Sequence, residues 1–286
     1  MSAYFGPGGN SDAFKKAGFT STIDAPRFVN GIGLNAYEYE AGNGLSATPA
    51  TLKLIGERAK LFGVKMSYHT PYFISLSGIV EEKRLKSIEY IRQSLDAANL
   101  LGADIIVVHC GSCAKISRRE AMTLAADTLS RTLEAVDTYG IKIGIETMGK
   151  INQLGTLDEV IELCKIDNRL VPVVDFGHLN ARDLGGVFVT PSDYLRVFDT
   201  ISTELGGEVA DNLHCHFSKI EWTNSGEKRH LTFEDSVYGP DFNPLVTVIA
   251  KENLSPTIIC ESAGTQSDDA LAMKRAYESL KGQELL

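Results

Sequence analysis

Histidines and carboxylates in this sequence follow apolar runs that are typical of buried strands. The run 171–174 ends at Asp175, and His178 follows three residues later, after a glycine. Buried parallel strands read as apolar runs of this kind. A carboxylate and an imidazole at the end of such a strand are suited to metal binding or to acid–base chemistry. Comparable strand ends supply His69, His109, Glu146, His214, His216 and Glu261.

Metal binding is favoured by the number of these groups. Taken singly, a strand-end histidine is more often hydrogen-bonded packing, and a glutamate is more often an ion-pair partner. His230, in the polar segment after residue 217, completes a set that contains all six histidines of the chain. Burying so many titratable groups together would cost several kcal/mol without compensating cations. The sequence therefore predicts a divalent-metal site.

The types of ligand limit which metal ions can bind and which reactions those ions can support. Imidazole and carboxylate without thiolate suit zinc, manganese or iron, and shared carboxylates suit a cluster of two or three ions. Such a cluster can activate water and stabilise both the attacking and the leaving oxygen in phosphodiester hydrolysis. The same ligands around one ion would instead hold the vicinal oxygens of a sugar for proton transfer.

Strand-like and helix-like segments alternate along the chain. We expect strands at 3–6, 31–37, 65–69, 103–110, 141–147, 171–176, 212–217 and 257–262. Helices are expected at 11–19, 48–62, 80–101, 117–139, 156–165, 190–205, 243–251 and 267–280, with a polar loop from 221 to about 238. Eight such units predict an α/β fold, a (β/α)8 TIM barrel forming one domain over residues 1–286, with its active site at the carboxyl ends of the strands.

A doubly wound open sheet is the alternative fold. It would need a glycine-rich phosphate loop after the first strand, and Gly6-Pro-Gly-Gly9 is not one. We therefore expect no nucleotide cofactor.

Composition limits the partners and the compartment. The formal net charge of −9 argues against non-specific binding to nucleic acid or anionic membranes, although a site that holds several cations can be locally positive. No apolar stretch is long enough to span a bilayer and no signal peptide is visible, so a cytoplasmic protein, without membrane contact and monomeric, is expected.

The five cysteines are odd in number and mostly lie in strand-like runs, which suggests reduced thiols. We interpret the pair Cys110 and Cys113 as incidental, because neither a second pair nor a thioredoxin-like context accompanies it. Since side chains alternate across a strand, Cys110, Cys215 and Cys260 should face the helices while their histidine and glutamate neighbours face inward.

Short motifs at these strand ends resemble the endonuclease IV family of AP endonucleases (AP endonuclease family 2), within the xylose-isomerase-like TIM barrel superfamily. The resemblance runs from about Ser67 to Ser262. It is carried by His69-Thr-Pro-Tyr72 (similar to the family's His-x-x-Tyr), His109-Cys-Gly-Ser (His-x-Gly-Ser), Ile-Glu146-Thr (Glu-Asn/Thr), Asp175-Phe-Gly-His178 (Asp-Thr-Cys-His), His214-Cys-His-Phe-Ser-Lys219 (His-x-x-x-x-Lys), Lys228-Arg229-His230 (Asp-Arg-His) and Cys260-Glu261-Ser (the final Glu).

The resemblance implies a zinc-dependent phosphodiesterase that cleaves DNA 5′ to abasic sites in base excision repair. It assigns the ligand role on the seventh strand to His214 rather than His216. Glu146 and Glu261 would orient the attacking water, and Tyr72, Lys219 and Arg229 would contact DNA. Two or three zinc ions, with manganese or iron as alternatives, would be held by His69, His109, Glu146, Asp175, His178, His214, His230 and Glu261.

Two departures from the family pattern affect this interpretation. Lys228 stands where the family has an aspartate ligand, so Glu227 or His216 would have to replace it, or the site would hold two ions. The segment 35–42 lacks the arginine that the family uses against DNA, and its glutamates would repel phosphates.

Two other functions remain open. In a sugar isomerase or epimerase, Glu146, Asp175, His214 and Glu261 would hold one ion, with the glutamates as acid and base. A barrel that binds metal without turnover is the third interpretation. The number of bound ions separates the first two, since one ion per chain favours the sugar enzyme and two or three favour hydrolysis.

Overall fold

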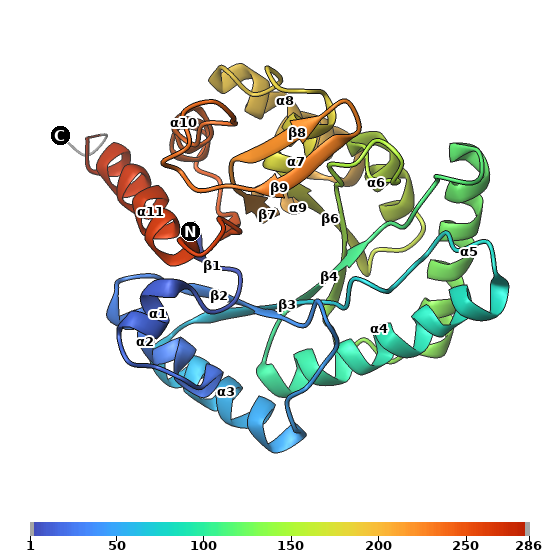
Figure 1. Cartoon of the computed structure of the whole chain (residues 1–286), viewed down its shortest axis with the longest axis horizontal. Coiled ribbons are helices and arrows are strands. Elements are labelled where there is room, and N and C mark those ends of the chain that lie inside the picture. Colours follow the sequence, from blue (N-terminus) through green and yellow to red (C-terminus); the bar gives the residue numbers. More distant parts are fainter. Residues whose placement is uncertain (1–2, 284–286) are drawn as a thin grey trace.

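Eight parallel strands form one sheet that curls around a central axis in the computed structural model, which describes residues 3–283 (Figure 1). The strands follow one another in the order β1, β10, β7, β6, β5, β4, β3, β2. The predicted TIM barrel is confirmed. Its strands are β1 (Tyr4–Pro7), β2 (Ala36–Glu40), β3 (Lys65–His69), β4 (Ile105–His109), β5 (Lys142–Glu146), β6 (Leu170–Asp175), β7 (His214–Phe217) and β10 (Thr257–Cys260).

Helices surround this barrel (Figure 1). Several helix ends are capped: Ser117 and Thr156 precede helices and form capping boxes, and Gly63 and Gly102 follow helices in the left-handed conformation. None of the helices within residues 3–283 is long and apolar enough to cross a membrane. They are α1 (Asp12–Lys16), η1 (Thr22–Asp24), α2 (Ala25–Gly31), α3 (Pro49–Phe62), α4 (Glu81–Leu101), α5 (Arg118–Ala135), α6 (Leu157–Cys164), α7 (Phe176–Arg182), α8 (Pro191–Leu205), α9 (Gly207–Asp211), α10 (Asn243–Lys251) and α11 (Gln266–Gln283).

Side-chain alternation separates the barrel interior from the layer beneath the helices. Ile105, Val107 and Val173 form a small apolar cluster of their own. Cys110, Cys215 and Cys260 belong instead to the large cluster shared with the helices, as the alternation predicts, and all five cysteines are free. Side chains two positions beyond the interior valines, at the carboxyl ends of their strands, therefore point to the barrel axis.

The second strand begins later than predicted. The expected strand 31–37 is wrong because residues 25–31 form α2, which has proline in its first turn. The strand runs from Ala36 to Glu40 instead, and Glu38 and Glu40 belong to it rather than to a following loop.

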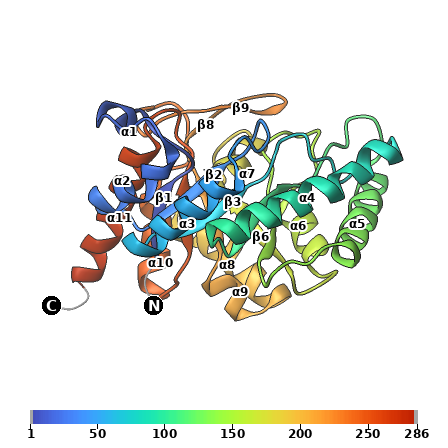
Figure 2. The ribbon, with the colours of Figure 1, turned by 90° about the horizontal axis from the view of Figure 1, so that it is seen from below.

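Two other segments differ from the predicted elements. Phe176 begins α7 rather than ending β6. The predicted polar loop contains an antiparallel hairpin, β8 (Ile220–Thr223) and β9 (Gly226–His230), which lies at one end of the barrel (Figure 2).

A glycine allows the barrel to close between β1 and β2. At this seam Asn35 N donates to Phe5 O at 3.2 Å and Gly9 N donates to Glu38 O at 3.0 Å. A Cβ on Gly6 would lie 1.8 Å from the Ala36 carbonyl oxygen, so the two backbones approach too closely for any side chain. The position of β2, and of its inward glutamates, depends on this contact.

We expect Gly6→Ala to destabilise the protein by about 1–3 kcal/mol or more, the usual cost of overpacking, because the clash is with backbone. Urea unfolding followed by circular dichroism measures the change. Gly31→Ala is the matched control, since a Cβ there meets nothing within 4 Å. Equal stability of the two variants would contradict this account of the seam.

Candidate metal centre

A cavity of about 790 Å³ opens at the carboxyl ends of the barrel strands. Its floor is formed by histidines and carboxylates from different strands, and its rim by the loops that follow them. Chemically active side chains in its lining are Glu40, His69, Tyr72, His109, Glu146, Lys150, His178, Glu227, His230 and Glu261.

The first group of potential ligands joins three neighbouring strands, β3, β4 and β5. Nε2 of His69 lies 3.5 Å and Nε2 of His109 lies 3.0 Å from Oε2 of Glu146. Nδ1 of His69 lies 2.9 Å from the Thr70 carbonyl oxygen, which accepts a hydrogen bond from it, so Nε2 is the nitrogen that a cation beside Glu146 would use. The ring of Tyr72 stacks on His109 at a centroid distance of 5.4 Å.

The second group shares Glu146 with the first. It consists of Glu146, Asp175, His216 and Glu261, with Nδ1 of His216 3.0 Å from Glu146 Oε1 and 3.4 Å from Glu261 Oε1. Glu146 and Asp175 are fully buried, and within residues 3–283 Glu146 Oε2 and Asp175 Oδ2 accept no hydrogen bond. Buried carboxylate oxygens without donors are costly unless a cation binds them.

The third group is completed by the hairpin. Glu227 Oε2 lies 3.5 Å from His178 Nε2, and the rings of His178 and His230 are 5.4 Å apart. A backbone hydrogen bond holds the hairpin against the loop after β5: Glu227 N donates to Gly149 O at 3.0 Å. A Cβ on Gly149 would lie 2.6 Å from Cβ of Glu227, so this glycine permits the close approach that brings Glu227 into the cavity.

The buried groups neutralise one another. Burial opposes the charged form of His216, but the carboxylates of Glu261, Glu38 and Glu146 outweigh it and raise its pKa well above the usual value. Burial also disfavours a charged Glu146, yet His216 and His109 lower its pKa. Burial raises the pKa of Glu261 to about 8. Protons therefore occupy positions that a divalent cation would take over.

The three groups fit a metal cluster by the chemistry of their donors. Within each group the potential ligand atoms lie within 4.8 Å of one another, and all are imidazole nitrogens or carboxylate oxygens. These donors suit zinc, manganese or iron. All of the predicted ligands except His214 fall within the three groups.

His216, rather than His214, contacts carboxylates that line the cavity, whereas His214 belongs to a deeper group of potential ligands with Glu38 and His216. Both point inward from β7, but His214 lies two residues further from the carboxyl end of the strand, and its Nε2 is 3.0 Å from Glu38 Oε2. His216 reaches Glu146 and Glu261.

Two of the residues expected to contact DNA lie outside the cavity. Nζ of Lys219 donates to the Asp235 carbonyl oxygen, and Lys219 lines a separate, smaller cavity. Arg229 pairs with Glu221 on the hairpin. Tyr72 remains at the rim, with 57% of its surface exposed.

Sequence reasoning missed the inward role of the glutamates on β2. Glu38 is fully buried and Glu40 lines the cavity. The available signal is the alternation Tyr37-Glu38-Tyr39-Glu40, which has the period of a strand. Because the expected strand ends at residue 37, both glutamates fall after it in the sequence-based prediction.

Comparisons with known sequences agree with this architecture. The family model described as xylose isomerase-like TIM barrel matches residues 26–283. An uncharacterized protein of Methanocaldococcus jannaschii is 28% identical over 254 residues, covering 88% of this chain and 89% of that protein. A probable endonuclease 4 of Mycoplasma genitalium is 30% identical over 205 residues, 69% of this chain and 66% of that protein.

Solved structures share the fold at lower identity. Endonuclease IV from Thermus thermophilus superposes with a TM-score of 0.68 at 20% identity, over 98% of this chain and 99% of that one. A D-tagatose 3-epimerase-like protein superposes with a TM-score of 0.73 at 18% identity, over 99% and 100% of the two chains. These structural likenesses concern the fold alone.

Substitutions of the two buried carboxylates should change the metal content to different extents. We expect Glu146→Gln to lower the number of bound cations more than Asp175→Asn, because Glu146 belongs to two groups and Asp175 to one. Elemental analysis after dialysis measures the content. Glu221→Gln, on the hairpin but outside the groups, should leave it unchanged. Wild-type metal content in Glu146→Gln would contradict the assignment.

The protonation of the site predicts pH-dependent metal affinity. Below its pKa of about 8, Glu261 carries a proton that must leave when a cation binds. Affinity for zinc should therefore rise as pH increases from about 6 to about 8, with protons released on binding. Calorimetry in buffers of different ionisation enthalpy measures the release. Affinity that does not change over this range would argue against Glu261 as a ligand.

Proposed function

The chain belongs to the xylose isomerase-like TIM barrel family, and on that premise we propose that it is a metal-dependent phosphodiesterase of the endonuclease IV type. The proposed reaction is hydrolysis of DNA on the 5′ side of an abasic site, as in base excision repair. The relative named probable endonuclease 4 supports this choice of substrate.

One observation carries the proposal: Glu146 is common to two adjacent ligand groups, and the third group lies beside them. Nδ1 of His178 is 3.4 Å from Glu146 Oε1, so the groups are contiguous. Two or three close cations suit in-line displacement at phosphorus. A one-ion sugar enzyme requires neither the pair His69 and His109 nor the group that contains His230.

The proposed ligand sets follow the three groups. We assign one cation to His69, His109 and Glu146, a second to Glu146, Asp175, His216 and Glu261, and a third to His178, Glu227 and His230. Glu227 thus takes the place of the aspartate that Lys228 replaces in the motif. When bound, such ions supply positive charge to the phosphodiester and lower the pKa of water. Zinc is the proposed metal, with manganese or iron as alternatives.

The other residues of the cavity would bind and orient the substrate. The carboxylates of Glu146 and Glu261 would orient the attacking water, and Glu261 is positioned to accept its proton. Tyr72, exposed at the rim and stacked on His109, offers a flat surface to a nucleotide next to the abasic site. Lys150 lines the same cavity and can approach a phosphate.

A sugar isomerase or epimerase is the second candidate. The observation that favours it is Glu40, a carboxylate that lines the cavity near His69 where a DNA-binding site would gain from a basic residue. In that reaction the group of Glu146, Asp175, His216 and Glu261 would hold a single ion. The likeness to a D-tagatose 3-epimerase-like structure fits this candidate in fold.

The experiment is nicking of a labelled duplex that contains one abasic site. Dialysis against a chelator should abolish nicking, and zinc or manganese should restore it. We expect His109→Ala to lower the rate on the order of 100-fold or more, because several kcal/mol of electrostatic stabilisation depend on the ligands. Cys110→Ala is the control, because its side chain lies in the outer apolar cluster.

The outcomes separate the candidates. Full nicking activity in His109→Ala would reject the assigned site. Epimerisation of ketoses by a protein that holds one ion and does not cut DNA would favour the second candidate. Bound metal with turnover of neither substrate would leave a binding barrel.

A further inference from the structure

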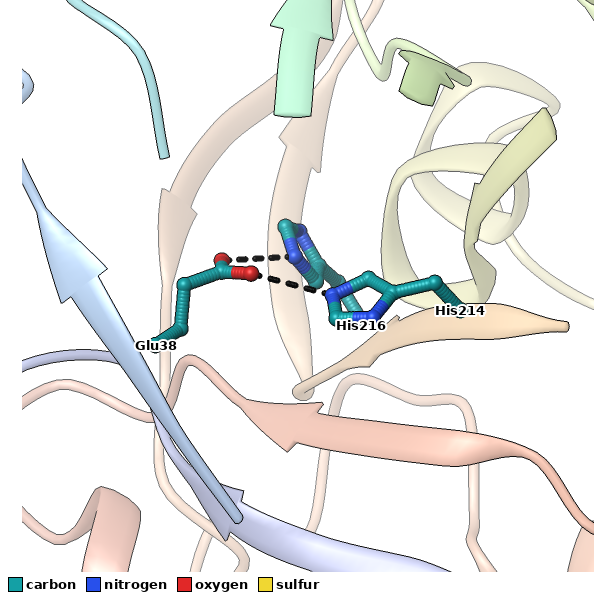
Figure 3. A group of neighbouring side chains, drawn as sticks. All are labelled: Glu38, His214 and His216. Carbon is teal, nitrogen blue, oxygen red and sulfur yellow. Dashed lines mark hydrogen bonds and ion pairs between the residues drawn. The ribbon is translucent and has the colours of Figure 1, made fainter. Parts of the chain in front are cut away.

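A buried carboxylate lies beneath the second ligand group. Glu38, on β2, reaches into the barrel interior toward His214 and His216 of β7 (Figure 3). Glu38 and His216 are fully buried, and His214 is 5% exposed. Nothing in the sequence motifs singles out Glu38.

Each oxygen of Glu38 has its own partners. Oε2 accepts a hydrogen bond from the Ser67 hydroxyl at 2.7 Å and one from Nε2 of His214 at 3.0 Å. Oε1 lies 2.8 Å from Nε2 of His216, an ion-pair distance, although the contact does not have the geometry of a hydrogen bond (Figure 3). Ser67 and His214 thus hold the carboxylate by one oxygen and leave the other for His216.

His216 lies between two different environments. Its Nε2 faces Glu38, whereas its Nδ1 lies 3.0 Å from Glu146 Oε1 and 3.4 Å from Glu261 Oε1. A neutral imidazole carries one N–H and one lone pair. The negative charges of Glu38 and Glu146 favour a proton on each ring nitrogen of His216 while no cation is bound. When a cation replaces the proton on Nδ1, the proton that remains is on Nε2, where the charge of Glu38, 2.8 Å away, stabilises it.

We propose that Glu38 is a positioning residue that holds His216 in the Nε2-protonated tautomer, so that Nδ1 is free to bind the second cation. The inference rests on the proposed function for the metal site itself. Ser67 and His214 act one step further out by fixing the orientation of Glu38. Outer partners of this kind orient a histidine ligand and raise its basicity.

Packing alone would not select these polar side chains. Val173, which pairs in register with His214 on the neighbouring strand, fills the interior with an apolar side chain. A carboxylate at the same depth must be desolvated, which is costly unless charged or hydrogen-bonding partners compensate. A role toward His216 explains why the chain maintains such a group here.

The test compares cation affinities in Glu38→Gln. The amide has nearly the same shape, but it carries no charge and has one accepting oxygen instead of two, so its NH2 group opposes an imidazole N–H. We expect the affinity of the second group for zinc to fall about 10–100-fold, the usual effect of losing an outer partner. Competition with a chromophoric chelator measures it, and the third group (His178, Glu227 and His230) provides an internal reference in the same protein.

Ser67→Ala is the matched control. It removes one neutral donor from Oε2 and keeps the charge of Glu38 and both imidazoles, so its effect on the second group should be much smaller than that of Glu38→Gln. Equal zinc affinity of the wild-type protein and Glu38→Gln, with the fold intact by circular dichroism, would overturn the proposal.

The tautomer is measured directly in the wild-type protein, which makes the test independent of how the variant folds. Long-range proton–nitrogen NMR of protein labelled with ¹⁵N-histidine, assigned with His216→Gln, should show the proton on Nε2 of His216 when metal is bound. A proton on Nδ1 would overturn the proposal, and so would diffraction at the metal absorption edge that locates an ion bonded to Glu38. Because these measurements follow binding, a protein that behaves as expected but cuts no abasic DNA would reject only the proposed reaction.

Discussion

The structure depends on compensating buried charge at the carboxyl end of the barrel. Carboxylates and imidazoles that have little or no exposure lie within ion-pair distance of one another, and Glu146 is the carboxylate that contacts most of the imidazoles. Such groups can stay buried only if protons or cations balance their charges. The same requirement explains why burial raises the pKa of Glu261 to about 8, whereas the imidazoles around Glu146 lower its pKa.

The barrel satisfies this requirement by simple geometry. Parallel strands all end at the same edge, and alternate residues point to the axis. His109 and Glu146 are register partners on neighbouring strands, so residues far apart in sequence become adjacent. Apolar side chains such as Val107 and Val173 fill the interior of the same strands. Beneath the candidate metal centre the barrel interior is therefore largely apolar, and Glu38 and His214 are polar side chains that enter it.

Much of the fold and of the candidate site could be predicted from sequence, because the residues at the strand ends are easy to recognise. The eightfold pattern, the inward direction of His109 and the outward direction of Cys110 follow from hydrophobic runs and alternation. Glu38 and Glu40 did not follow, because α2, whose signal in the sequence is Pro26 in its first turn, shifts the start of β2. Which histidine of β7 binds a cation stays a prediction, since His214 and His216 share one face and only their depth along β7 differs.

The number of bound ions also determines which substrate the cavity can attract. Six carboxylates face or underlie the cavity, those of Glu38, Glu40, Glu146, Asp175, Glu227 and Glu261, and Lys150 is the lysine in its lining. With all carboxylates ionised and the histidines neutral, three divalent ions and Lys150 exceed these charges by one, whereas one ion leaves the cavity negative by three. A negative cavity repels a phosphodiester, while a positive one concentrates it. Under the proposed function, a cation in the third group, completed by Glu227 from the hairpin, is thus what would make a phosphodiester electrostatically acceptable despite Glu40.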